Sequence, residues 1–196
     1  MRVVVLIDWQ NAYHHAREAF GLDDEPLERG TISALGLATA LLHGLPGHGH
    51  QLVRVEVHRG LPDSRRQKVA NASVLRQRDA WIAEDPERVV PKLRPLAYNP
   101  DPEEKGIDVA VVVSGLEWTI TGGAELVIIF SHDSDMQPGI EAICRLYGAD
   151  KVATGSWWSR AHWKRIPPTL GVKNITLDED AFLKMETPVD YRPVTN

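Results

Sequence analysis

The sequence predicts an α/β fold in which helices cover both faces of a central, mostly parallel sheet, a three-layer αβα sandwich. Two runs, Arg2–Ile7 and Glu125–Phe130, are almost entirely apolar and rich in β-branched residues, which is typical of strands that are buried on both faces. Between and after them, helix-like and strand-like segments alternate. This alternation favours a parallel sheet, whose active sites lie beyond the carboxyl ends of the strands.

The N-terminal part of the chain predicts one strand and two helices. The strand Arg2–Ile7 stops at Asp8, and a helix is predicted over Ala12–Phe20, followed by a loop over Gly21–Pro26. Leucine and alanine residues at helical spacing predict a further amphipathic helix within Thr31–Leu45.

The middle of the chain predicts a strand, a helix and a second strand. In Leu52–His58, valines alternate with polar residues, which indicates a half-exposed or edge strand. Ser64–Glu84 lacks glycine and proline and is rich in basic residues, so we predict a helix with one basic side. Val89–Leu96 contains Pro91 and Pro95, which places this strand at the periphery of the sheet.

The run Val109–Val113 has the composition of a strand. However, Glu117 and Trp118 continue an apolar pattern at helical spacing. We therefore predict a helix over about Asp108–Thr121, because it would supply the crossover to the next strand. A further helix is predicted over Met136–Tyr147.

The C-terminal part begins with a short predicted strand, Lys151–Thr154, and ends with a short predicted helix, Asp178–Met185. We expect a single domain over residues 1–155, with residues 156–196 as an extension that packs on it.

Composition limits the cellular context and the partners. The chain has 196 residues and a net charge of -5, so a polyanion would have to be held by a local basic patch or through metal ions. The single cysteine, Cys144, excludes an internal disulfide framework. No apolar run approaches the roughly 20 residues that cross a bilayer, and the N-terminal run is too short for a signal peptide. These features predict a cytoplasmic protein with no membrane partner.

Several common sites are missing from the sequence. No phosphate-binding Gly-x-x-x-x-Gly-Lys loop and no dinucleotide-binding Gly-x-Gly-x-x-Gly motif follows a strand, so we expect no nucleotide cofactor. Two groups of histidines lack the spacing of a zinc site and are predicted to be surface residues. They are His14 and His15, and His43, His48 and His50.

Aspartates follow the two apolar strands. Asp8 comes after the first strand, and Asp133 and Asp135 come after the second, so all three should project toward one rim of the sheet. Gathered carboxylates repel one another unless a cation neutralises them, and oxygen ligands favour Mg²⁺ or Mn²⁺. The simpler alternative is that each aspartate caps the helix that follows it.

Three blocks of sequence carry a resemblance to a known family. Ile7–Asn11, Lys105–Ala110 and Ser131–Met136 resemble, in order and spacing, the signature blocks of NYN domains, LabA-like members of the PIN-like nuclease superfamily. The resemblance spans roughly Arg2 to Gly155. It implies a PIN-like, Rossmann-like three-layer fold and metal-dependent cleavage of RNA.

The resemblance also implies roles for individual residues. Asp8, Asp108, Asp133 and Asp135 would be the metal ligands and catalytic carboxylates. Asn11 would steer a ligand or the substrate, and Ser131 would position the backbone near the metal. In such a site the ions hold the scissile phosphate and lower the pKa of a bound water, which becomes the nucleophile.

Two positions depart from the family pattern. Ser114 stands where a second helical aspartate is frequent, and His132 stands where glycine is usual. An alternative function is therefore a catalytically degenerate module that binds RNA or protein. A third interpretation, a phosphatase with an aspartyl nucleophile, would require covalent phosphorylation of Asp133.

Candidate substrate contacts lie around these blocks. Arg59 follows a strand end and Lys105 adjoins the acidic site, so both are candidate phosphate ligands. Trp9 lies between two site residues and is the aromatic side chain expected to contact the substrate. The stretch Trp157–Arg165 interleaves aromatic and basic residues, which suits stacking of unpaired RNA bases, burial at a domain edge, or a homodimer contact.

Overall fold

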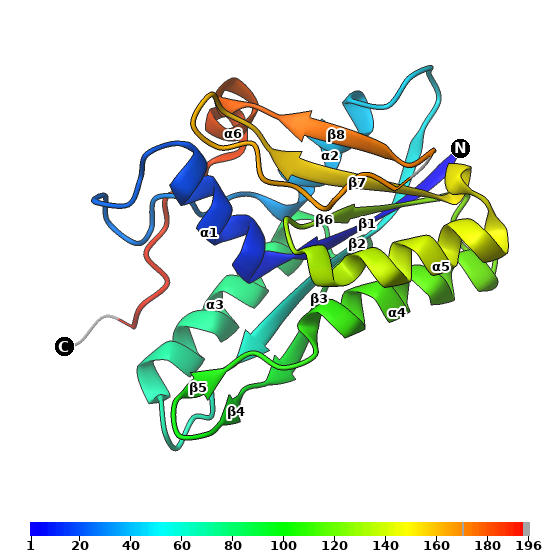
Figure 1. Ribbon diagram of the computed structural model, residues 1–196. Helices are drawn as coiled ribbons and strands as arrows, with labels where there is room; N and C mark the ends of the chain where they lie inside the picture. The colour runs from blue at the N-terminus through cyan, green and yellow to red at the C-terminus, as the bar shows by residue number, and fades with distance from the viewer. Residues whose placement is uncertain (170, 194–196) are drawn as a thin grey trace.

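A computed structural model describes residues 1–169 and 171–193. Figure 1 shows a sheet of six strands in the order β3-β2-β1-β6-β7-β8, with helices on both faces. Every neighbouring pair in this sheet runs parallel, so the predicted three-layer α/β sandwich is confirmed. The strands are β1 (Arg2–Asp8), β2 (Gln51–Leu61), β3 (Val89–Pro95), β6 (Leu126–Phe130), β7 (Val152–Trp157) and β8 (Lys173–Leu177).

The helices divide between the two faces of the sheet. One face carries α1 (Trp9–Ala19), α2 (Ala34–His43), α3 (Lys68–Glu84) and α6 (Glu179–Met185), and the other carries α4 (Ile107–Ile120) and α5 (Gln137–Tyr147). Two short 3-10 helices, η1 (Ser134–Met136) and η2 (Ala149–Lys151), flank α5, and β4 (Ala97–Tyr98) pairs with β5 (Pro102–Glu103) in a separate antiparallel ribbon.

Strand β1 joins the two hydrophobic cores. Val3, Val5 and Ile7 pack in the core beneath α1 and α2, whereas Val4 and Leu6 pack in the core beneath α4 and α5. All five are fully buried, and burial of each such side chain contributes roughly 1.5–3 kcal/mol. The strand is apolar at consecutive positions because neither of its faces meets solvent.

The strand order creates a switch point at the edge of the sheet. The chain builds β1, β2 and β3 outward in one direction and then returns through α4 to place β6 on the opposite side of β1. The carboxyl ends of β1 and β6 therefore diverge into different connections, which is where parallel α/β sheets form their ligand crevices. Asp8 ends β1, and Ser131 follows β6.

Several predicted elements are confirmed. The segment after Gly106 forms the helix α4, although its valines favour a strand, and β3 lies at the edge of the sheet, where its prolines break no ladder within it. The predicted C-terminal helix is α6.

Other expectations are corrected by the structure. Strand β2 lies between β1 and β3 and is not an edge strand. Its polar residues Glu56 and His58, which alternation assigned to solvent, are buried at 4% and 2% exposure. Helix α1 begins at Trp9 instead of Ala12, because Asp8 caps it, and the extension after residue 155 adds an unpredicted strand, β8, which pairs with β7.

Among the described residues, no helix has both the length and the apolar composition that crossing a membrane requires.

Candidate functional site

Hydrogen bonds connect the ends of β1 and β6 at the switch point. The Asp8 carboxylate accepts a hydrogen bond from the Ser131 hydroxyl at 3.2 Å and from the backbone N–H of Asn11 at 3.4 Å. The Ser131 hydroxyl oxygen in turn accepts from the backbone N–H of Asp133 at 3.2 Å. Asp8 thus both caps α1 and lies beside the residues that follow β6, so the capping and site interpretations of the sequence are compatible.

Asp8 is a buried carboxyl group, with 6% of the residue exposed. Burial raises its pKa from 3.8 to about 7. The hydrogen bonds from Asn11 and Ser131 oppose this rise in pKa, while the negative charges of Glu104 and Asp133 add to it. At neutral pH the group lies near its titration midpoint, and no cation among the described residues compensates its charge, so it could accept a proton or bind a cation.

Glu104 is a carboxylate near the site that sequence reasoning missed. Its Oε1 accepts a hydrogen bond from the backbone N–H of Gly60 at the end of β2, at 2.6 Å. A Cβ at Gly60 would lie 2.5 Å from the same oxygen, so glycine is needed for this approach. The available signal was the acidic loop that ends directly before Lys105, but only the fold places that loop against β2 and near Asp8.

His132 has a positioning role. It is 1% exposed, its Nδ1 lies 3.0 Å from Asn11 Oδ1, and its Nε2 accepts from the backbone N–H of Trp157 at 2.9 Å. Its own backbone N–H donates to Asn11 Oδ1 at 2.7 Å. Burial lowers the pKa of His132 to about 2, so the imidazole stays neutral with both nitrogens engaged. It holds Asn11 in place and is not free to bind a metal.

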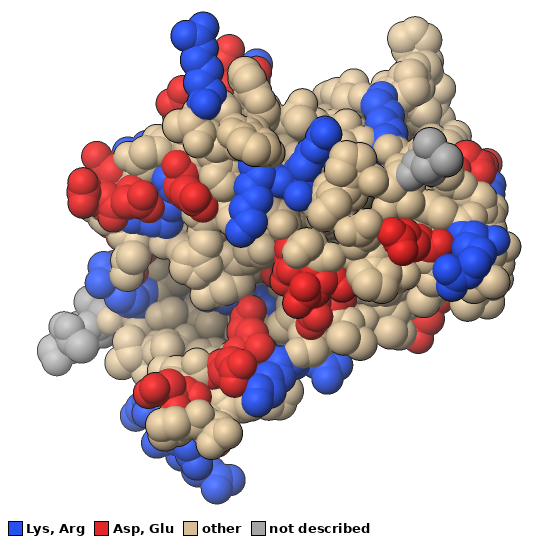
Figure 2. All heavy atoms as spheres, in the orientation of Figure 1, with Lys and Arg blue, Asp and Glu red and all other residues tan. Residues whose placement is uncertain are grey.

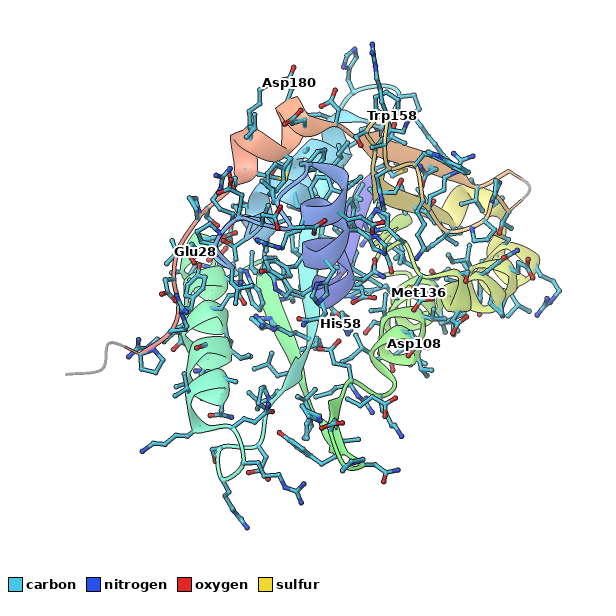
Figure 3. The ribbon with its side chains drawn as sticks, turned by 60° about the vertical axis from the view of Figure 1, so that its left-hand side comes forward. Glu28, His58, Asp108, Met136, Trp158 and Asp180 are labelled. Carbon is cyan, nitrogen blue, oxygen red and sulfur yellow. The ribbon has the colours of Figure 1, made fainter. Side chains whose placement is uncertain are left out.

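The remaining predicted aspartates surround Asp8 more loosely. Asp133 caps η1 by accepting from the backbone N–H of Asp135 at 2.9 Å, and Asp135 itself is exposed. Asp108 is half-buried in the first turn of α4 and is labelled in Figure 3. In the part of the chain that the structure describes, no three of these carboxylates bring oxygen atoms within 4.8 Å of one another.

A different cluster of side chains does bring three potential metal ligands within this distance. His15, Glu18 and His162 place one ligand atom each within 4.8 Å of the others. Both imidazoles face the same carboxylate, with His15 Nδ1 3.1 Å and His162 Nδ1 3.4 Å from its oxygens. His15 is 9% exposed, so its prediction as a surface residue is wrong. Burial and then the charge of Lys164 lower the pKa of His15, and this nearby cation opposes binding of a metal ion.

A basic cavity opens beside Glu104. It has a volume of about 810 Å³ and lies between the end of β2, the start of α3 and the β4–β5 ribbon. Figure 2 shows the hollow on this face, with charged side chains along its border. Burial lowers the pKa of Arg59 to about 10, and the negative charge of Glu104 opposes that lowering, so the guanidinium stays charged at neutral pH. The charged residues that line it are Arg59, Arg66, Lys68, Glu104 and Arg192.

Two predicted substrate residues lie elsewhere. Trp9 is 2% exposed, and its ring packs edge-on against Trp81 with 4.6 Å between the ring centroids. Its indole belongs to the core, which corrects the expectation of a solvent-facing aromatic platform. Lys105 is exposed and pairs with Glu103 at 3.3 Å, and it is not among the residues that line the cavity.

A second buried carboxylate, Glu56, lies beneath α4. The Trp118 indole donates to Glu56 Oε1 at 3.1 Å, and Lys92 Nζ lies 3.8 Å from the same oxygen. His58 Nε2 is 3.4 Å from Glu56 Oε2, a contact without hydrogen-bond geometry. Burial alone would raise the pKa of Glu56, but the contacts from His58, Trp118, Lys92 and Ser114 lower it to about 2.

Comparisons with known proteins bear on the fold alone. No protein-family model and no curated protein matches the sequence. Among solved structures, the chain is similar to VPA0982 of Vibrio parahaemolyticus, described as a protein of unknown function. The TM-score is 0.57 at 18% identity, over 91% of this chain and 94% of that chain. The likeness shows that this α/β arrangement exists in a solved structure.

Proposed function

We propose that the protein is a metal-dependent ribonuclease that hydrolyses RNA phosphodiester bonds, with Mg²⁺ or Mn²⁺ held at Asp8. One observation carries the proposal: Asp8 is buried at the switch point of the sheet with a pKa raised to about 7 and two further carboxylates nearby. A cation would remove the electrostatic cost of ionising Asp8 there. Asp8 is also the first metal ligand that the resemblance to NYN domains implies.

The donor set suits a hard divalent cation. Asp8, Glu104 and Asp133 offer carboxylate oxygens, and the neighbouring histidine His132 is already hydrogen-bonded on both nitrogens. Mg²⁺ keeps several waters and is commonly held by one or two carboxylates together with substrate phosphates. A site without three converging carboxylates is compatible with this kind of binding. When bound, the ion would lower the pKa of a coordinated water and neutralise charge on the phosphate.

The protein's own residues would orient the site. Ser131 and the backbone N–H of Asn11 fix the two oxygens of Asp8 by hydrogen bonds. His132 fixes the side chain of Asn11 from both its ring and its backbone. These constraints hold the carboxylate in one orientation before any ligand arrives, which reduces the ordering that binding requires.

The basic cavity supplies a path for the phosphate backbone. Its basic residues provide positive charge beside Glu104, in a chain whose net charge is -5. A polyanion would therefore be attracted to this cavity more than to the rest of the surface. RNA is the substrate that the sequence resemblance implies, and the single cysteine fits action in a reducing compartment such as the cytoplasm.

Metal-dependent cleavage tests the proposal. A panel of single- and double-stranded RNAs would be incubated with Mn²⁺, Mg²⁺ or EDTA and with wild type, Asp8→Asn or Asp133→Asn. We expect cleavage by wild type with either ion, none in EDTA, and a loss of roughly 100-fold or more in Asp8→Asn. Asp150→Asn is the matched control, because Asp150 is exposed and pairs with Lys151 before β7. Well-folded wild type that cleaves no RNA with either ion would overturn the proposal.

One observation favours a second function, a binding module without catalysis. The aspartates do not converge on one point in the described chain, and serine, not aspartate, stands at position 114, where the family often has another carboxylate. Binding of RNA or protein that is indifferent to EDTA and to Asp8→Asn, without cleavage, would support this function.

A further inference from the structure

The segment that follows β7 exposes two tryptophans. Trp158 is 46% exposed and Trp163 is 76% exposed, whereas the adjacent Trp157 is fully buried. Three basic residues in the same segment, Arg160, Lys164 and Arg165, are also exposed. Single exposed apolar side chains are ordinary on a protein surface, but several in one short segment commonly mark a binding site. We refer to residues 158–166 as the tryptophan turn.

The tryptophan turn is held in a defined conformation. The backbone N–H of Ser159 donates to the carbonyl of His162 at 2.7 Å, and the N–H of His162 donates to the Ser159 hydroxyl at 3.1 Å. His162 is 5% exposed beside Glu18 of α1, and Ile166 is 2% exposed in the second core. Two buried anchors therefore present the residues between them to solvent, and the exposure of Trp163 follows from this local structure.

The turn lies close to the candidate nuclease site. The His162 ring is 5.7 Å from the ring of His132, which bonds Asn11. In Figure 3, Trp158, Met136 and Asp108 follow one another down the same side of α1. The turn also follows β7, the neighbour of β6 in the sheet, so it leaves the same edge as Ser131. A strand of nucleic acid at the switch point would thus extend toward the turn.

We propose that the tryptophan turn binds single-stranded nucleic acid, with an unpaired base stacked on Trp163 and the phosphates paired with Arg160, Lys164 and Arg165. An exposed indole offers a flat apolar face to any base, and interleaved cations neutralise the backbone. A duplex gains less, because its base faces are already stacked on each other. The inference deepens the proposed ribonuclease function, on which it rests, by naming the unpaired form of the substrate.

The charges favour nucleic acid over a protein partner. The turn concentrates three exposed cations in nine residues, while the chain as a whole carries a net charge of -5. A polyanion would meet this local positive charge together with the basic cavity on the same edge. Flat apolar complementarity to a protein would not require these cations next to the aromatic rings.

Binding in EDTA tests the inference separately from cleavage. A fluorescently labelled single-stranded RNA and its duplex would be titrated with wild type, Trp163→Ala and Tyr147→Ala, and anisotropy would report the Kd. Tyr147 is an exposed aromatic residue at the end of α5 and serves as the matched control. Because Trp163 is largely exposed, its replacement should leave the Tm unchanged.

We expect Trp163→Ala to raise the Kd for single-stranded RNA about 10-fold, with Tyr147→Ala unchanged and the duplex bound more weakly by wild type. Replacing Lys164 and Arg165 by Gln should reduce the dependence of Kd on salt. Equal binding of single-stranded RNA by wild type and Trp163→Ala, or no RNA binding by either, overturns the inference.

The two proposals can fail independently. If cleavage needs metal and Asp8, but Trp163→Ala binds and cleaves the RNA as well as wild type does, the ribonuclease proposal holds and the role of the tryptophan turn is refuted. If wild type binds RNA through Trp163 but never cleaves it, the role of the tryptophan turn is supported and the ribonuclease proposal is refuted.

Discussion

Asp8 and Glu56 are two buried carboxylates on neighbouring strands, and their surroundings shift their pKa values in opposite directions. Both lie on the face of the sheet that α4 covers, and both are less than 10% exposed. Glu56 has contacts from His58, Lys92 and Trp118 that lower its pKa to about 2. Asp8 forms no ion pair with any described residue, and its pKa is raised to about 7.

The difference separates a structural carboxylate from a candidate functional one. Around Glu56 the protein supplies its own positive charge and hydrogen-bond donors, so the ionised form is stable in the folded state. Around Asp8 it adds Glu104 and Asp133 instead. Of these two carboxylates, Asp8 is the one without a compensating charge, and it lies at the switch point, where the proposed function would bring a cation and an anionic substrate together.

The largest stability effect should come from Glu56→Gln. A folded-state pKa of about 2 against 4.5 in the unfolded chain gives stability that is present above pH 4.5 and is lost as the pH falls through about 2. We expect the variant to lose about 3 kcal/mol of unfolding free energy at neutral pH. Urea titrations at neutral and strongly acidic pH would measure it. An equal loss at both pH values would show that the charge of Glu56 is not what stabilises the fold.

Asp8→Asn should have the opposite effect. The folded-state pKa of Asp8 is raised above its unfolded value of 3.8, so wild type loses stability as the pH rises from about 4 to about 7. In EDTA, we expect the amide variant to be about 2 kcal/mol more stable than wild type at mildly alkaline pH. The two proteins should become similar at acidic pH. Destabilisation by Asp8→Asn at alkaline pH would contradict the raised pKa.

The sequence could predict the elements whose pattern matches their final environment. Strand β6 and the Val3–Ile7 part of β1 are apolar throughout because helices cover both faces of the sheet there. The helix α4 was predictable because Glu117 and Trp118 extend its pattern beyond the valines. Strand β2 was placed wrongly, because the polar half of its alternation faces α4. There the Trp118 indole donates a hydrogen bond to Glu56, and Lys92 compensates its charge. That compensation depends on residues far away in the chain.

The residues of the candidate site also divide into those that the sequence could predict and those that it could not. That Asp8 lies near the residues that follow β6 could be predicted from the sequence, because the strand ends of a parallel sheet meet at one edge. The roles of Asn11 and Ser131 were implied by the family resemblance alone. The role of Glu104 could not be predicted, since its approach to Asp8 depends on the contact of its loop with Gly60. Trp9 was misassigned because neighbours in sequence can face opposite sides, and its ring packs on Trp81 in the core.

The smallest expected effect is on the titration of Asp8 itself. Glu104→Gln removes a negative charge that raises the pKa of Asp8, so that pKa should fall, but it should stay above 3.8 because burial is the larger cause. NMR titration of the Asp8 carboxyl carbon in EDTA would measure the change. Glu103→Gln is the matched control, because Glu103 is exposed and pairs with Lys105.

Gly60→Ala provides a second way to move Glu104. The added Cβ would lie 2.5 Å from Glu104 Oε1 and closer still to the Leu96 side chain, so both the carboxylate and Leu96 must shift away from the end of β2. If the pKa of Asp8 changes in both Glu104→Gln and Gly60→Ala but not in Glu103→Gln, Glu104 is electrostatically coupled to the site. An unchanged pKa in Glu104→Gln would leave burial as the cause of the shift, and Glu104 would then have no place in a cation site at Asp8.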